Sequence, residues 1–229
     1  MKTARPERVI GPTRREIQAR LARRARKAGV ALPTETAAGL IAYIELLARW
    51  NSRINLTSLP LFEPTDETVD RLLIEPLLAA GHLSPTSTVI DIGSGGGSPA
   101  IPLKLALPGI VMRLVESKTR KAAFLREAVR HLNLQNVVVE ATRFEELLAE
   151  PGLNEAFDVA TLRAVRIEHR AMTTVHGFLK PGGRAFLFRR SSTSPVLPQT
   201  LPTFQLDSTH SLVESLDSQL VILRKTSFR

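Results

Sequence analysis

Cysteine is absent from this chain, so disulfide bonds, cysteine nucleophiles and zinc sites built on thiolates are excluded. The five histidines show no metal-ligand spacing, and we predict no metal site. No apolar run approaches the ~20 residues of a membrane-spanning helix, and the N-terminus lacks the apolar core of a secretory signal. We therefore expect a cytoplasmic enzyme or binding protein that does not enter a membrane.

Acidic residues are scarce at one end of the chain. Lys and Arg number 31 against 22 Asp and Glu, a net charge of +9, and residues 1–30 carry nearly all of that excess. A concentrated basic segment favours a polyanionic partner, because each phosphate that it neutralises releases counterions. A solvated basic tail is the alternative, and charge alone does not decide between the two. The candidate RNA-binding residues in this segment are Arg15, Arg23, Arg24 and Lys27.

The first third of the chain shows helical spacing. Residues 1–13 are interrupted by Pro6 and Gly11-Pro12, and we predict a disordered basic arm there. Residues 14–84 are predicted to form a helical region. The first helix is predicted over 13–28, the second begins at an N-cap at Thr34, and the third is predicted over 67–80. Tyr43 and Trp50, seven residues apart near one helical face, are better explained by core packing than by base stacking.

From residue 85 the apolar pattern changes to short buried strands that alternate with helices. The predicted strands are 88–93, 111–117, 136–143, 157–163 and 183–189, and the helices between them are 98–107, 118–132, 144–149 and 167–179. This alternation predicts an α/β fold for 85–229, a Rossmann-like, doubly wound and mostly parallel sheet. Residues 204–210 and 218–225 are expected to add a closing antiparallel pair.

A glycine-rich turn, "DIGSGGGSPAIPL", follows the first predicted strand. Glycines at this point let the backbone turn sharply and approach a ligand. Gly93 and Gly95 belong to a G-x-G-x-G pattern, not to the G-x-G-x-x-G of dinucleotide enzymes. Glu116, at the end of the second predicted strand, suits ribose hydroxyls of either NAD or S-adenosylmethionine. Asp91 would repel a diphosphate and suit a cationic ligand, so we place a methyltransferase ahead of a dehydrogenase, with an empty tight turn as a third explanation.

Several motifs, in order and spacing, resemble the RsmG (GidB) methyltransferases of bacteria. They are "LIAYIELLARWNSRINLTSL", "DIGSGGGSPAIPL", "ESKTRKAAFLREAVRHLNLQNV", "ATRFEEL", "FDVATLRAV" and "GFLKPGGRAFLF". The resemblance implies a class I, S-adenosylmethionine-dependent enzyme with an N-terminal helical extension. It further implies methyl transfer to N7 of a guanine in small-subunit (16S) ribosomal RNA. Ribosomal RNA or the small subunit is then the partner, and we expect a monomer.

The resemblance also implies site residues. Its cofactor contacts correspond to Gly93, Ser98, Phe144, Glu145 and Arg163, which join Gly95 and Glu116 from the glycine-loop argument. No catalytic residue is assignable. Arg163 is the single candidate, as a ligand of the cofactor carboxylate or of a substrate phosphate, and a salt bridge with Glu168 is the alternative explanation. Arg189 and Arg190 are predicted RNA contacts near the site.

The chain departs from the family pattern at three places. "RLLIEP" stands where the family has K-H-x-x-D-S, so Leu72 replaces a histidine and Glu75-Pro76 an Asp-Ser pair. Ala100 replaces a glycine, and Arg189-Arg190 a Lys-Gly pair. Two alternatives therefore stay open: an RNA-binding relative without methyl transfer, and a methyltransferase with another substrate. The lack of a general-base cluster is compatible with N7 chemistry, because the lone pair of N7 is unprotonated at neutral pH and alignment alone can accelerate the reaction.

Overall fold

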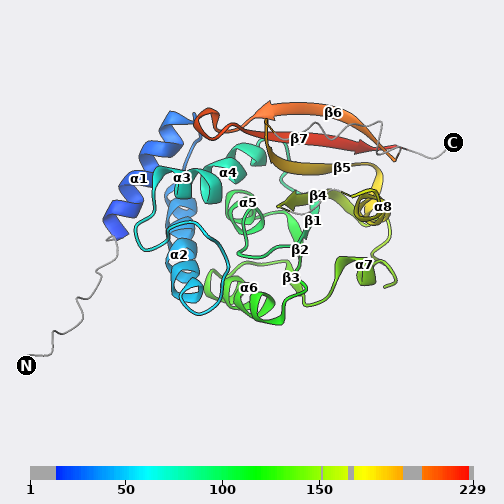
Figure 1. Cartoon of the computed structure of the whole chain (residues 1–229), viewed down its shortest axis with the longest axis horizontal. Helices are drawn as coiled ribbons and strands as arrows, with labels where there is room; N and C mark the ends of the chain where they lie inside the picture. The colour runs from blue at the N-terminus through cyan, green and yellow to red at the C-terminus, as the bar shows by residue number, and fades with distance from the viewer. Residues whose placement is uncertain (1–13, 151, 165–167, 193–202, 227–229) are drawn as a thin grey trace, which may run out of the picture.

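The computed structural model describes residues 14–150, 152–164, 168–192 and 203–226. The predicted basic arm, the first residue of the helix predicted over 13–28 and residues 193–202 lie outside these ranges. Figure 1 shows a sheet that runs through the molecule with helices on both sides and the N-terminal helices gathered at one end.

The N-terminal region is helical, as predicted. Helix α1 (Arg14–Lys27) ends before Gly29, whose φ of 67° suits glycine, and α2 spans Thr34–Asn51. The predicted cap at Thr34 is wrong, because Pro33 occupies the N-cap position and no side chain caps the helix. The third predicted helix consists of three segments: α3 (Asp66–Val69), the π-helical η1 (Asp70–Ile74) and α4 (Glu75–Ala80).

The sheet confirms the predicted fold class. The strands are β1 (Thr88–Ile92), β2 (Val111–Val115), β3 (Val137–Glu140), β4 (Phe157–Arg163), β5 (Leu179–Arg190), β6 (Phe204–Ser211) and β7 (Ser218–Lys225). Their order is β3-β2-β1-β4-β5-β7-β6; the first five are parallel, and β7 is antiparallel to both β5 and β6. The remaining helices are α5 (Ala100–Ala106), α6 (Thr119–His131), α7 (Phe144–Leu147), α8 (His169–Phe178) and the 3₁₀ turn η3 (Glu214–Leu216).

Two apolar layers cover the two faces of the sheet. Alternate strand residues such as Val89 and Ile90 point to opposite faces, as the period of two requires. One face packs against α5 and α6, with α1, α2, η1 and α4 in the same core; the other packs against α7 and α8. In Figure 1, α2 lies outside α5 and α6. The helices of 14–84 therefore share a core with the sheet, and the boundary at residue 85 stays a prediction.

The strand register determines where a ligand can lie. Strand β1 sits between β2 and β4, where the strand order reverses, and ligands of doubly wound sheets bind at this point beyond the carboxyl ends. Ile92 is level with Val115 of β2 and with Leu162 of β4. The next residues along these three strands, Gly93, Glu116 and Arg163, consequently meet at one edge.

Candidate cofactor site and nucleic-acid surface

Two glycines of the loop after β1 have different structural roles. Both have positive φ, 51° at Gly95 and 88° at Gly97. A Cβ at Gly97 would lie 2.5 Å from Cδ1 of Ile101, so this glycine permits close packing of the loop on α5. A Cβ at Gly95 would meet only the carbonyl oxygen of Gly93, at 3.7 Å. Gly95 therefore borders open space, which is where a bound ligand has room to approach the backbone.

Four amides of the loop donate hydrogen bonds within the protein itself. The amides of Gly93 and Ser94 donate to the carbonyl of Val115 at 2.9 and 3.0 Å, and the Gly97 amide donates to the Ser94 carbonyl at 2.6 Å. The Gly95 amide donates to Oε2 of Glu116 at 2.9 Å. A pyrophosphate site needs amides that point outward at the anion. With these four donors occupied, the geometry favours a nucleoside over a dinucleotide diphosphate.

Glu116 points at the glycine loop, as the ribose hypothesis requires. Its carboxylate is buried, and the two oxygens accept from the amides of Gly95, at 2.9 Å, and Lys118, at 2.7 Å. Each oxygen of a carboxylate has two acceptor sites. One site per oxygen consequently remains for the two hydroxyls of a ribose, and the role of Glu116 in ribose binding stays a prediction.

Asp91 places a buried carboxyl group beneath the loop. The residue is 1% exposed, and Oδ1 accepts from Oγ1 of Thr161 at 2.5 Å. Oδ2 has no hydrogen-bond partner within the part of the chain that the structure describes. Burial raises the pKa of this carboxyl, while the Thr161 hydroxyl and the charge of Arg163 oppose that rise. A buried carboxylate oxygen without a donor fits a cationic ligand better than an anionic one.

Arg163 is held tightly at the end of β4. One terminal nitrogen donates to the Arg71 carbonyl and the other to Oε2 of Glu75, at 2.7 Å, and the guanidinium lies 4.6 Å from the centroid of the Phe188 ring. Desolvation lowers the pKa of Arg163, and the Glu75 carboxylate opposes that shift. The alternative explanation, a salt bridge at the end of the strand, is confirmed, but its partner is Glu75 and not Glu168. The Nε atom of Arg163 is buried and has no hydrogen-bond partner among the described residues.

The acceptors for Arg163 and Ser98 arise from the irregular helix. In η1 the Glu75 amide donates to the carbonyl of Asp70, five residues back, which leaves the Arg71 carbonyl unused. The next residue, Pro76, has no N–H to offer. The Arg71 carbonyl therefore accepts from Arg163, and the Leu72 carbonyl accepts from Oγ of Ser98 at 2.9 Å. Sequence reasoning missed this role of Glu75 and Pro76, whose only signal was the departure at "RLLIEP".

The other predicted cofactor residues lie along the same edge. Phe144 begins α7 after β3 and packs half-buried on the core, whereas Glu145 is exposed and lies 3.8 Å from Arg143. Ala100 is the buried first residue of α5, a helical position that does not require glycine. At the end of β5, Phe188 is level with Arg163. The two predicted RNA contacts that follow it, Arg189 and Arg190, therefore lie at the carboxyl edge.

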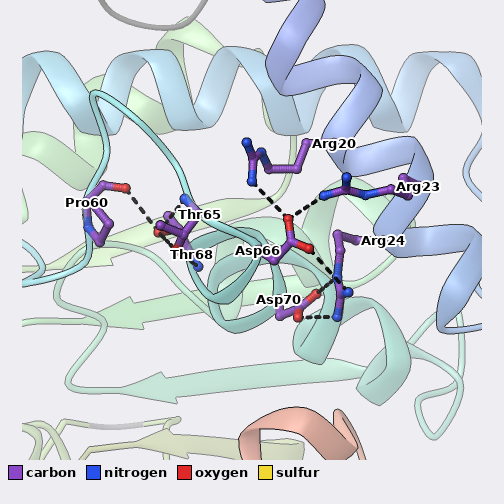
Figure 2. Close-up of polar contacts among 8 residues, drawn as sticks. All are labelled: Arg20, Arg23, Arg24, Pro60, Thr65, Asp66, Thr68 and Asp70. Carbon is purple, nitrogen blue, oxygen red and sulfur yellow. Dashed lines mark hydrogen bonds and ion pairs between the residues drawn. The ribbon is translucent and has the colours of Figure 1, made fainter.

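The basic helix α1 is partly neutralised by α3 and η1. Figure 2 shows Asp66 between Arg20 and Arg23, with distances of 2.9 and 2.5 Å, and Arg24 facing Asp70. Arg24 and Asp70 form a paired contact, 2.7 and 2.5 Å, and both are buried.

The prediction of Arg24 as an RNA contact is therefore corrected, because its guanidinium is buried and bonded to the carboxylate of Asp70. Arg15 and Lys27 are exposed, and Arg23 is exposed but paired with Asp66. Spacing on the basic helix did not reveal this difference, because Asp66 and Asp70 come from a segment more than 40 residues away.

Comparison with known proteins decides the family. The family model described as rRNA small subunit methyltransferase G matches residues 36–216. This chain belongs to that family. The ribosomal RNA small subunit methyltransferase G of Xanthomonas oryzae pv. oryzae is 35% identical over 199 residues, which cover 85% of this chain and 89% of the relative. That of Dichelobacter nodosus is 46% identical over 115 residues, 50% of this chain and 53% of the relative.

Solved structures agree with the fold of this methyltransferase G family member. A mutant of MtNAS in complex with S-adenosylmethionine has a TM-score of 0.58 and 15% identity, over 93% of this chain and 97% of that one. At this identity the likeness concerns the fold alone. None of the helices in the described ranges has the length and apolar character needed to cross a bilayer. Within those ranges no group of three or more His, Cys, Asp or Glu residues is arranged for a metal ion.

Proposed function

We propose that this protein transfers a methyl group from S-adenosylmethionine to N7 of a guanine in small-subunit (16S) ribosomal RNA. The observation that carries the proposal is the glycine loop: four of its amides are bonded within the protein, Gly95 borders open space, and the carboxyl groups of Glu116 and Asp91 lie beside and beneath it. The family names of the relatives supply the class of substrate. We further propose that the protein acts as a monomer in the cytoplasm.

The residues present fit S-adenosylmethionine as the cofactor. Glu116 would accept from the ribose hydroxyls, and the unpartnered Oδ2 of Asp91 would accept from the ammonium group. Gly93, Gly95 and Ser98 line the loop, and Phe144 and Glu145 follow β3, where the base of a nucleoside lies in doubly wound folds. When bound, the cofactor supplies a methyl group on a positively charged sulfur.

The chain's contribution to the reaction is alignment. Guanine N7 has a free lone pair at neutral pH, so no residue has to remove a proton before it attacks the methyl carbon. Placing nucleophile, methyl carbon and sulfur in line supplies up to about 7–11 kcal/mol. Arg163 acts in this scheme by holding Glu75 and the η1 carbonyls beside the loop, because both of its terminal nitrogens are committed to the protein.

The RNA-facing side of the proposal uses cations of α1 and of the end of β5, of which Arg189 is half-buried and the others are exposed. We propose that phosphates are contacted by two groups of residues: Arg15, Lys27 and the ion-paired Arg23 on α1, and Arg189 and Arg190 at the end of β5. Phosphate contacts position a protein on RNA and carry most of its salt-dependent affinity.

Incubation with labelled S-adenosylmethionine and small ribosomal subunits tests the proposal. The expected result is label in 16S RNA at guanine N7, located by chemical cleavage at the modified base. Binding of the cofactor without label in RNA would indicate a methyltransferase for another substrate. Absence of cofactor binding in calorimetry at millimolar concentration, with RNA binding retained, would indicate a relative that has lost methyl transfer.

The altered segment "RLLIEP" does not favour that loss. Leu72 contacts the glycine loop through its backbone carbonyl, which any residue provides, and Glu75 supplies the carboxylate for Arg163. The link between this segment and the cofactor loop is thus present in the structure despite the departures from the family motif.

A further inference from the structure

Tyr43 reaches the cofactor loop from outside the sheet. It lies on α2, is fully buried, and its hydroxyl donates to the carbonyl of Gly96 at 2.6 Å. It is also the only tyrosine of the chain. The sequence predicted Tyr43 as a core residue, which its burial confirms, but its hydroxyl bonds a loop 53 residues away.

The peptide unit between Gly96 and Gly97 is held at both of its polar ends. Its carbonyl oxygen accepts from Tyr43, and its N–H donates to the Ser94 carbonyl at 2.6 Å. This peptide is flanked by two glycines, Gly96 and Gly97, of which Gly97 has a positive φ, and glycine passes readily between conformations. Without a donor at the Gly96 carbonyl, rotation of this peptide would redirect the loop beside the open space at Gly95.

The surroundings of Gly96 add a steric contact to the polar one. A Cβ placed there would lie 3.3 Å from the Leu56 carbonyl oxygen and 3.4 Å from Cδ1 of Leu47. Leu56 is itself fixed by Asn51, whose Oδ1 accepts from the amides of Leu56 and Thr57 at 2.8 and 3.0 Å. Leu47 of α2 and Leu56 of the segment that follows it therefore pack behind the loop, and Tyr43 of α2 donates the hydrogen bond to it.

We propose that Tyr43 is a positioning residue for the cofactor: its hydroxyl sets the orientation of the Gly96–Gly97 peptide and so the shape of the loop that receives S-adenosylmethionine. This inference rests on the cofactor part of the proposed function. Burial also raises the pKa of the phenol, so the hydroxyl stays a donor across the working pH range. The N-terminal helices thereby complete the cofactor site as well as bearing the basic surface.

The test compares Tyr43→Phe with Thr88→Val. Both remove one hydroxyl that lies within hydrogen-bond distance of a backbone carbonyl, but Thr88 lies at the start of β1, at the opposite end of the strand from the loop. The Thr88 hydroxyl also accepts from the Asp158 amide at 3.0 Å and lies 2.8 Å from Oδ2 of Asp158, so its removal breaks more contacts than the removal of the Tyr43 hydroxyl. In calorimetry, Tyr43→Phe is expected to raise the Kd for S-adenosylmethionine about fivefold or more, and Thr88→Val to leave it unchanged. At saturating cofactor, the loss of kcat in Tyr43→Phe should be smaller than its loss of cofactor affinity, and its KM for RNA should stay within about twofold of that of the unsubstituted protein.

Equal cofactor affinity of Tyr43→Phe and the unsubstituted protein would overturn the inference. An equal loss of affinity in both variants would overturn it too, since a general loss of stability lowers the affinity of both.

A second measurement needs no substitution. Because Tyr43 is the only tyrosine, 3-fluorotyrosine labels this position alone, and S-adenosylmethionine is expected to shift its single ¹⁹F resonance. A resonance that does not move while calorimetry reports binding would also contradict the inference.

The outcomes separate this inference from the proposed function. Cofactor binding without methylation of RNA would remove the substrate assignment and leave the role of Tyr43 to be decided by calorimetry and the ¹⁹F signal. A protein that binds no S-adenosylmethionine at all would remove both.

Discussion

At the scale of single residues, the site depends on a few atoms without partners. Oδ2 of Asp91, Oε1 of Glu75 and Nε of Arg163 are buried and lack hydrogen bonds among the described residues. Buried polar atoms are normally paired, so each such atom requires an explanation. All three atoms lie near the carboxyl edge of the sheet, beside the proposed cofactor site, and Oε1 of Glu75 lies 3.6 Å from the guanidinium of Arg71.

Gly95→Asp is expected to abolish cofactor binding while leaving the fold intact. Asp tolerates a positive φ better than most residues, and space for its side chain is open. The new carboxylate would fill the cofactor space and repel Glu116, which accepts from this amide. Calorimetry with S-adenosylmethionine measures the loss, and circular dichroism the fold. Gly29→Asp is the matched control, with a φ of 67° and open space, and should bind normally.

Two histidines make the stability of the fold sensitive to acid. Burial lowers the pKa of His82 from 6.5, with further lowering by His210, whose ring centroid is 4.0 Å away, and by Arg184. Burial also lowers the pKa of His176. The unfolded chain therefore takes up protons first, so this stability is complete above about pH 6.5 and declines as the pH falls below it.

Urea unfolding at pH 7.5 and 5.5 measures that decline. His82→Gln is expected to show a smaller difference in unfolding free energy between the two pH values than the unsubstituted protein. An equal difference in both proteins would show that His82 does not contribute.

At the scale of elements, helix α1 is joined to the rest of the molecule through its charges as well as its apolar stripe. Ile17, Leu21 and Ala25 are buried on one face, and Arg24 lies beside them in contact with Asp70 of η1. The segment η1 in turn bonds Ser98 and Arg163 at the cofactor site. A π-helical turn is rare and often marks a functional site.

Arg24→Met is expected to destabilise the protein by about 3–5 kcal/mol, because Asp70 would stay buried without its counterion. Chemical denaturation measures the change. The double variant Arg24→Met, Asp70→Leu removes both charges and should recover most of the loss. Arg23→Met, which breaks an exposed pair with Asp66, should cost less than about 1 kcal/mol. Similar losses for Arg23→Met and Arg24→Met would contradict the assignment of different roles.

At the scale of the whole molecule, the positive charge is concentrated at the N-terminal end, in and before α1. Figure 1 places α1 beside α2 and α3, at one end of the sheet. The exposed cations of α1 are therefore proposed to extend the RNA-binding surface beyond the carboxyl edge of the sheet, where Arg189 and Arg190 lie.

Replacing Arg15 and Lys27 by Gln is expected to weaken binding to 16S RNA and to reduce the slope of log affinity against log salt by about 2. Filter binding between 50 and 200 mM salt measures the slope, and thermal unfolding should change little because both residues are exposed. Arg49→Gln, an exposed cation on α2, is the control. An unchanged slope in the double variant would show that α1 does not contact phosphates.

Local pattern predicted most of the fold and part of the site. The strands and helices from residue 88 onward are confirmed within a few residues, because a buried parallel strand needs a continuous apolar run and a helix an apolar stripe. The meeting of Gly93, Glu116 and Arg163 followed from strand order. Local pattern did not predict three other features: the hydrogen bond of Tyr43, the Arg24–Asp70 pair and the π turn before Pro76. The first two join segments that are far apart in the sequence, and the third distorts a helix, so residue spacing within one segment does not reveal them.

The sequence by itself determined the fold class and the family, because both follow from residue types at short spacing; the edge of the sheet at which the cofactor binds stays a prediction. Only the tertiary structure decided which charges remain available and which groups shape the loop. A buried ion pair or a hydrogen bond between distant segments depends on how close the folded chain brings them, and that distance is set by the packing of the whole core.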